Sequence, residues 1–266
     1  MEEKKNPQPF KIHVPLANNE LLEKALKNIN DNSEVRTLWR VININAIDRL
    51  RMSDHGPVHV QIVSNIAIKM TRILIRHQVE MSITRFYELP AQYAELVVLL
   101  ASLFHDLGMS ISREGHEEFS LFLANNLLHQ ILEFLPIEER TIVTSEILHA
   151  IISHRSEGKP ITIEAGIVRV ADALDMSEGR SRIPYEAGNV DIYSISAAAI
   201  DKVEILDGED RPIQLNILMN NSAGLFQVDE LLKRKLVGSG IEKLVKVRAF
   251  IERESEKKLI KEFEIS

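Results

Sequence analysis

Apolar residues recur every three or four positions through the first two thirds of the chain, the spacing of amphipathic helices. This pattern predicts helices over residues 20–30, 33–50, 57–77, 90–106, 116–132, 138–153 and 161–176. No segment before about residue 185 has the alternation expected of a strand. We therefore expect an all-α domain over residues 19–188. Residues 1–18 contain three prolines and no helical period, which predicts an extended arm lying on this protein or on a partner subunit.

After residue 190 the period changes from helical to alternating. Strands are predicted over residues 200–206 and 212–219, joined by a polar turn at 207–210. A helix over 227–237 follows, and then strands over 245–251 and 259–265. Residues 189–266 are therefore expected to form a small α+β domain of order ββαββ. The predicted fold class is mainly α: a helical domain followed by this smaller domain.

Composition narrows the possible functions. The 266 residues include no cysteine, which excludes disulfides, zinc–thiolate sites, iron–sulfur clusters and cysteine nucleophiles. The net charge of −7 argues against a broad nucleic-acid surface, although it leaves room for one small anion at a local basic cluster. The first residues lack the apolar core of a signal peptide, and no apolar run looks long enough to cross a membrane. We expect a cytoplasmic protein.

The dipeptide His105-Asp106 is the most informative feature for chemistry. It follows the apolar run 96–104, which is typical of a buried core helix, and Gly108 ends that helix. Burying a carboxylate is costly unless a cation or a set of donors compensates it. Similar apolar stretches carry four more candidate ligands: His59, His116, His154 and Asp172. A divalent metal site is the simplest explanation, with Mn, Fe, Co, Ni or Mg suited to these ligands and Zn possible.

The spaced pattern His59, His105-Asp106 and Asp172 resembles that of the HD-domain superfamily of metal-dependent phosphohydrolases. The resemblance covers roughly residues 50–182 and includes the sequence around each ligand. Within that superfamily, the sequence is most similar to an uncharacterised prokaryotic group that carries a C-terminal α+β domain. The resemblance implies a compact all-α domain in which the ligands converge between helices.

The resemblance also implies a second metal ion. His116 and His154 look like the extra ligands of two-metal branches, with Asp106 bridging two ions about 3.5–4 Å apart. His149 is the alternative to His154 for this role. If it is not a ligand, it could orient one by a hydrogen bond. Asp175 is a second such supporting residue.

The implied activity is hydrolysis of a phosphoester or phosphoanhydride in a nucleotide or similar phosphorylated small molecule. Catalysis would rest on Asp106, His105 and Arg180. The candidate phosphate-binding residues are cationic side chains near the ligands, chiefly Arg113, Lys159, Arg180 and Arg182, with Arg155 a weaker candidate.

Two alternatives stay open. The same ligands support a diiron oxygenase in relatives of this fold, and a non-catalytic sensor could bind metal and nucleotide. Met109 stands where the dNTP-triphosphohydrolase branch has a histidine, and no Gly-Tyr-Pro follows His105-Asp106 as in one cyclic-dinucleotide branch. The arm and the additional sheet make a homodimer our expectation.

Overall fold

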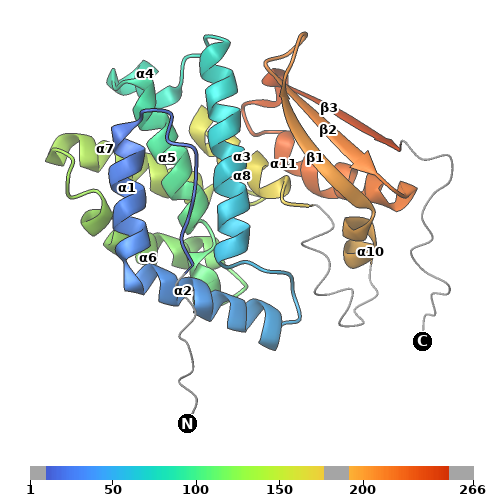
Figure 1. Cartoon of the computed structure of the whole chain (residues 1–266), viewed down its shortest axis with the longest axis horizontal. Coiled ribbons are helices and arrows are strands. Elements are labelled where there is room, and N and C mark those ends of the chain that lie inside the picture. The colour runs from blue at the N-terminus through green and yellow to red at the C-terminus, as the bar shows by residue number, and fades with distance from the viewer. Residues whose placement is uncertain (1–9, 177–191, 252–266) are drawn as a thin grey trace.

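The computed structural model describes residues 10–176 and 192–251 and has a helical domain beside a small sheet, so the predicted fold class is confirmed (Figure 1). The helical domain contains these elements: α1 (Glu20–Asp31), α2 (Ser33–Asn43), η1 (Ile44–Arg49), α3 (Pro57–Arg76), α4 (Ser82–Tyr87), α5 (Ala91–Phe104), η2 (Leu107–Ser110), α6 (His116–Ile131), α7 (Ile137–Ile152) and α8 (Ile163–Ala173).

Polar caps start several of these helices where the sequence places them. The side chain of Asn19 accepts hydrogen bonds from the backbone at the start of α1, Asn32 does so for α2 and Thr162 for α8. The predicted helix 33–50 is a continuous helical segment whose last part, η1, has π-type hydrogen bonding. The six-residue α4 was not predicted, because so short a helix shows too little of the helical period.

Helix α5 forms the centre of the helical domain. All residues from Leu96 to Phe104 are buried, with α3, α7 and α8 packed around them. By length and composition alone α3 and the segment Ala91–Ser110 could cross a membrane, so the expectation that no run is long enough was wrong on that criterion. However, 56% and 83% of their apolar windows are buried inside the protein, as in core helices.

The described part of the arm packs on its own chain. Ile12 is buried, and its backbone N–H and carbonyl both bond to the Asn30 side chain of α1, at 2.8 and 3.0 Å. The Asn65 amide of α3 donates to the His13 carbonyl at 2.9 Å. The described part of the arm therefore ties α1 to α3 of its own chain.

The C-terminal module contains a three-stranded sheet of order β1 (Ile200–Asp207), β2 (Ile213–Met219) and β3 (Val245–Ile251), preceded by α10 (Ile192–Ala198). β1 and β2 form the predicted antiparallel hairpin, whereas β3 pairs with β2 in parallel, with Ile213 opposite Val245. A parallel pair needs a crossover connection. Here it holds η3 (Ser222–Gly224), η4 (Gln227–Leu232), α11 (Lys233–Leu236) and η5 (Glu242–Leu244). The predicted strand 259–265 lies outside the described residues.

The two parts of the chain are in contact along one side of the helical domain. The sheet lies beside α3 (Figure 1). The crossover elements η4 and α11 contact α8. Because α8 carries Asp172, the crossover is brought next to one of the candidate metal ligands.

Candidate metal centre

Six candidate ligands from five helices converge inside the helical domain. They sit at helix ends or in the turns that follow them: His59 in the first turn of α3, His105 and Asp106 after α5, His116 at the start of α6, His154 after α7 and Asp172 in the last turn of α8. The side chains of the four histidines are at most 1% exposed, and those of Asp106 and Asp172 are 6% and 13% exposed. The structure thus brings together all six residues that the sequence singled out.

Asp106 lies between two pairs of histidines. Its Oδ2 is 3.6 Å from His59 Nε2 and 3.5 Å from His105 Nε2. Its Oδ1 is 3.1 Å from His116 Nε2 and 3.9 Å from His154 Nε2. Each carboxylate oxygen therefore faces a different pair, which is the arrangement needed for a carboxylate that bridges two cations.

Asp172 completes the group on the side of the first pair. Its Oδ1 lies 3.3 Å from His59 Nε2 and 3.7 Å from His105 Nε2. The donor atoms of His59, His105 and Asp172 lie within 4.8 Å of one another, and the same holds for His105, Asp106 and His154. Both groups have a size that one metal ion can span.

All four imidazoles have their Nδ1 atoms facing an oxygen and their Nε2 atoms facing the centre. The Nδ1 partners are Ser102 O for His105 (2.8 Å), Ile151 O for His154 (2.6 Å), Arg113 O for His116 (2.9 Å) and Asp175 Oδ2 for His59 (2.6 Å). Carbonyl oxygens only accept hydrogen bonds, so Nδ1 carries the proton and Nε2 is left with a lone pair. This is the form in which histidine binds a metal.

The inward-facing lone pairs fit a metal better than they fit each other. His59 Nε2 and His105 Nε2 are 3.2 Å apart, and neutral rings held by their Nδ1 protons place two lone pairs face to face there. A cation between them converts this repulsion into attraction. Two imidazole pairs, two carboxylates and no thiolate therefore suit a divalent ion, and the chemistry of the donor set fits the metal that the sequence predicts.

The electrostatics of the cluster favour charged Asp106 and Asp172 carboxylates and a neutral His154 imidazole. Burial raises the pKa of Asp106, but its interactions with His105 and His116 outweigh burial and hold that pKa well below its usual range. Burial lowers the pKa of His154 well below normal, with further lowering by His105 and Lys235. These are the protonation states that metal binding requires.

The structure orients His149 and His154 differently. His149 Nε2 accepts a hydrogen bond from the backbone N–H of Ile161 at 3.0 Å, so its ring holds the loop that leads into α8. His154, five residues later, is buried and faces Asp106. The backbone after α7 therefore directs His154, and not His149, to the candidate centre.

Two predicted phosphate-binding residues lie beside the cluster. Arg113 is close enough to Asp106 and Asp172 for both carboxylates to raise its pKa, against a larger lowering by burial and by Arg155. Arg155 follows His154 directly. Lys159 is exposed and, among the described residues, has no hydrogen bond or ion pair with a ligand. Arg180 and Arg182 lie outside the described residues.

The sequence analysis missed two residues next to the cluster. The ring of His55 lies 5.5 Å from that of His59, centroid to centroid, and its Nδ1 is 2.8 Å from Ser53 O. His55 precedes α3, so no helical spacing marks it. The other is Lys235 of α11, whose ammonium pairs with Asp172. No local pattern marks Lys235, because it belongs to the C-terminal module.

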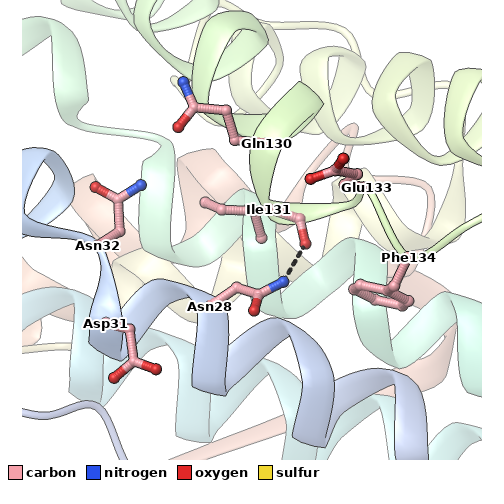
Figure 2. Close-up of a pocket in the computed structure, with 7 residues that line it drawn as sticks. All are labelled: Asn28, Asp31, Asn32, Gln130, Ile131, Glu133 and Phe134. Atoms are coloured by element: carbon pink, nitrogen blue, oxygen red, sulfur yellow. Dashed lines mark hydrogen bonds between the residues drawn. The ribbon is translucent and has the colours of Figure 1, made fainter.

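A separate groove of about 530 Å³ lies where the end of α1 meets the end of α6 (Figure 2). Its lining residues are Asn28, Asp31, Asn32, Gln130, Ile131, Glu133 and Phe134. The Asn28 amide donates to the Ile131 carbonyl at 2.9 Å across it. Its lining has two carboxylates and no cationic or imidazole side chain, so it suits neither a phosphate group nor the predicted metal chemistry.

Comparisons with known proteins agree with the geometry. The family model of the HD domain matches residues 59–177, a range that contains all six candidate ligands. The uncharacterised protein MJ1020 of Methanocaldococcus jannaschii is 41% identical over 224 residues, covering 84% of this chain and 86% of that protein. So long an alignment fits neither within residues 1–177 nor within 59–266, so it extends beyond the HD domain on both sides. No solved structure matches.

Proposed function

The chain belongs to the HD-domain family of metal-dependent phosphohydrolases, and from this premise we propose that it hydrolyses a phosphoester or phosphoanhydride of a nucleotide or similar phosphorylated small molecule. The observation that carries the proposal is Asp106, whose two oxygens face two different histidine pairs. A bridging carboxylate between two imidazole pairs is typical of two-metal sites for phosphoryl chemistry.

The donor atoms divide between two positions. His59, His105 and Asp172 would hold one divalent ion, His116 and His154 the other, and Asp106 would contact both. When bound, such ions neutralise phosphate oxygens and lower the pKa of a water molecule that attacks phosphorus. The protein's own part is to keep the four Nε2 atoms unprotonated and aimed at the centre, through their Nδ1 hydrogen bonds.

Arg113 and Arg155 supply positive charge for the substrate. Burial and the nearby charge of Arg155 both lower the pKa of Arg113. Within the described part of the chain, neither arginine has an ion pair with a carboxylate. An anion can therefore pair with both, because a phosphate group accepts the paired N–H groups of a guanidinium. In hydrolysis the same contacts stabilise charge on the transferring phosphoryl group.

The test combines metal analysis with an activity screen. We expect the purified protein to contain divalent metal and to release phosphate or pyrophosphate from a nucleotide panel supplemented with Mn, Mg, Co or Ni. Asp106→Asn should abolish release, because the amide cannot supply the negative charge between the two positions. The matched control is Glu146→Gln, since Glu146 is a buried carboxyl of α7 that bonds to Tyr87 and lies outside both candidate metal groups.

Three outcomes would contradict the proposal. Stoichiometric iron with no release across the panel would favour an oxygenase. A protein without metal and without turnover would favour a ligand sensor. Release that survives in Asp106→Asn would show that the reaction takes place elsewhere in the chain.

A further inference from the structure

We propose that Lys235 of α11 binds the substrate's phosphate group at the metal centre, so that the C-terminal module completes the active site of the helical domain. This inference rests on the proposed function and extends it to the role of the second module. The observation behind it is the ion pair between Lys235 Nζ and Asp172 Oδ2. The side chains of the two residues are 18% and 13% exposed.

The ammonium of Lys235 lies on the outer side of the candidate ligands. Asp172 turns Oδ1 towards His59 and His105, whereas Lys235 takes Oδ2. A cation of the C-terminal module thus pairs directly with a ligand of the first candidate metal position.

Neighbouring residues of α11 show that the inward direction of Lys235 is specific. Lys233 pairs with Asp229 at 2.6 Å and Arg234 with Glu230 at 2.7 Å, each four residues earlier on the same helical segment. Both basic side chains are about two-thirds exposed, at 66% and 67%. Of three consecutive basic residues, Lys235 is the one that reaches the helical domain.

Close packing with α8 sets the position of α11. A Cβ on Gly166 would overlap the carbonyl oxygen of Ser239, so a glycine at this position lets the chain after α11 lie directly on α8. Arg169, one turn further along α8, donates from Nη2 to the carbonyl of Arg234 at 3.1 Å. These contacts lie on both sides of Lys235 in the sequence.

The same arginine connects α11 with the loop that follows His154. Arg169 donates to the carbonyls of Ser156 at 2.8 Å and Gly158 at 2.5 Å. That loop contains Arg155. Arg169 therefore fixes Lys235 and Arg155 relative to each other, and with Arg113 they supply three cations from three separate segments.

An ammonium has three N–H donors, and Asp172 is the ion-pair partner that the described residues give Lys235. If Asp172 also served as a metal ligand, it would share its negative charge with the ion, and the Lys235 ammonium would be able to bind a second anion. In phosphate ester hydrolysis that anion would be a phosphate oxygen of the substrate. Lys235 would then be a phosphate ligand contributed by the C-terminal module.

Lys235→Met tests this, because methionine keeps an unbranched, flexible side chain without the charge. Titration calorimetry would measure two affinities separately: that of the protein for Mn²⁺, and that of the Mn²⁺-loaded protein for inorganic phosphate. We expect the dissociation constant for phosphate to rise about tenfold or more, as for loss of a charged hydrogen bond. Mn²⁺ affinity should stay equal or increase, because the ammonium no longer competes for Asp172. Lys233→Met is the matched control and should change neither value.

The two affinities separate phosphate binding from a purely structural role. Unchanged phosphate affinity in Lys235→Met would overturn the inference, and so would a parallel loss of Mn²⁺ and phosphate affinity. Lys235→Arg, which keeps the charge, should recover most of the phosphate affinity. With a hydrolysed nucleotide, Lys235→Met should raise KM more than it lowers kcat.

This experiment also distinguishes the inference from the proposed function. Phosphate binding needs no turnover, so weaker binding in Lys235→Met supports the inference even if the wild-type protein hydrolyses nothing in the panel. Conversely, a wild-type hydrolase whose Lys235→Met variant binds phosphate normally would leave the proposed function intact and overturn the inference alone.

Discussion

The contact between Asp175 and His59 gives the sharpest test of how the candidate centre is supported. Asp175 Oδ2 lies 2.6 Å from His59 Nδ1, and the two side chains are 2% and 0% exposed. The carboxylate accepts a hydrogen bond from Nδ1–H and makes the opposite nitrogen, Nε2, a stronger metal ligand. Asp175→Asn keeps the volume and one acceptor oxygen but removes the charge.

Loss of such a supporting partner typically weakens metal binding by about 10–100-fold, or roughly 1.4–2.7 kcal/mol. A metal that binds only the folded state stabilises it by its binding free energy, so saturating Mn²⁺ should protect the variant less by the same amount. In a domain of this size about 1 kcal/mol moves Tm by roughly 2–4 °C. The rise in Tm caused by Mn²⁺ should therefore shrink by roughly 3–10 °C.

Titration calorimetry with Mn²⁺ and thermal unfolding in Mn²⁺ or in EDTA would measure both effects. Glu146→Gln is the matched control, and its Mn²⁺ affinity should equal that of the wild type. Asp175→Asn with wild-type Mn²⁺ affinity would refute the reasoning, because the His59 ring would then be oriented without the carboxylate. A loss of Tm that is the same in EDTA and in Mn²⁺ would show a packing defect instead.

Three further predictions follow from the packing. His154→Asn should weaken Mn²⁺ binding in calorimetry, whereas His149→Asn should not, because only His154 faces the cluster. Gly166→Ala should lower the free energy of unfolding in urea by about 1–3 kcal/mol, because its methyl group overlaps the Ser239 carbonyl. Burial raises the pKa of Glu164 above its usual value of 4.5, so the folded state loses stability as pH rises above the pKa of the unfolded chain and on through the raised folded pKa. Glu164→Gln should therefore gain stability relative to the wild type as pH rises above 4.5 in urea unfolding.

Each of these has a clear contrary result. Equal Mn²⁺ affinities in the two histidine variants would contradict the assignment of His154. Wild-type stability in Gly166→Ala would mean that the C-terminal module does not rest on α8 at that point. A stability difference for Glu164→Gln that stays constant with pH would show that its carboxyl does not titrate differently in the folded and unfolded states.

The sequence predicted the helical domain well because its evidence is local. Each main helix has an apolar period, and α1, α2 and α8 also have a capping side chain, so their bounds agree with the structure within a few residues. The ligands were found for the same reason, since His59 and Asp172 fall on apolar faces of their own helices. Where periodicity is weak, as in α4, or where pairing depends on distant segments, as for β3 beside β2, the sequence was uninformative.

Contacts between the two modules could not be predicted in this way. The path from Gly166 and Arg169 to Lys235 depends on how the crossover docks on α8, and that docking is a property of the assembled fold. Arg113 and Arg155 likewise come near each other only when two loops meet. The positions of the cationic side chains around the candidate centre therefore depend more on tertiary contacts than the positions of the metal ligands do.

The four histidines divide in the same way: some rings are oriented by a residue nearby in the sequence, and one by a residue far away in it. His105, His116 and His154 each bond through Nδ1 to the carbonyl three residues earlier, so the backbone near each helix end sets the ring direction. His59 lies in the first turn of its helix and instead bonds to Asp175, 116 residues away. The first metal position thus depends on the docking of α8 against α3, because α8 leads directly into Asp175 and also carries Asp172. A substitution that disturbs α8 should therefore displace His59 and Asp172 more than it displaces His116 and His154.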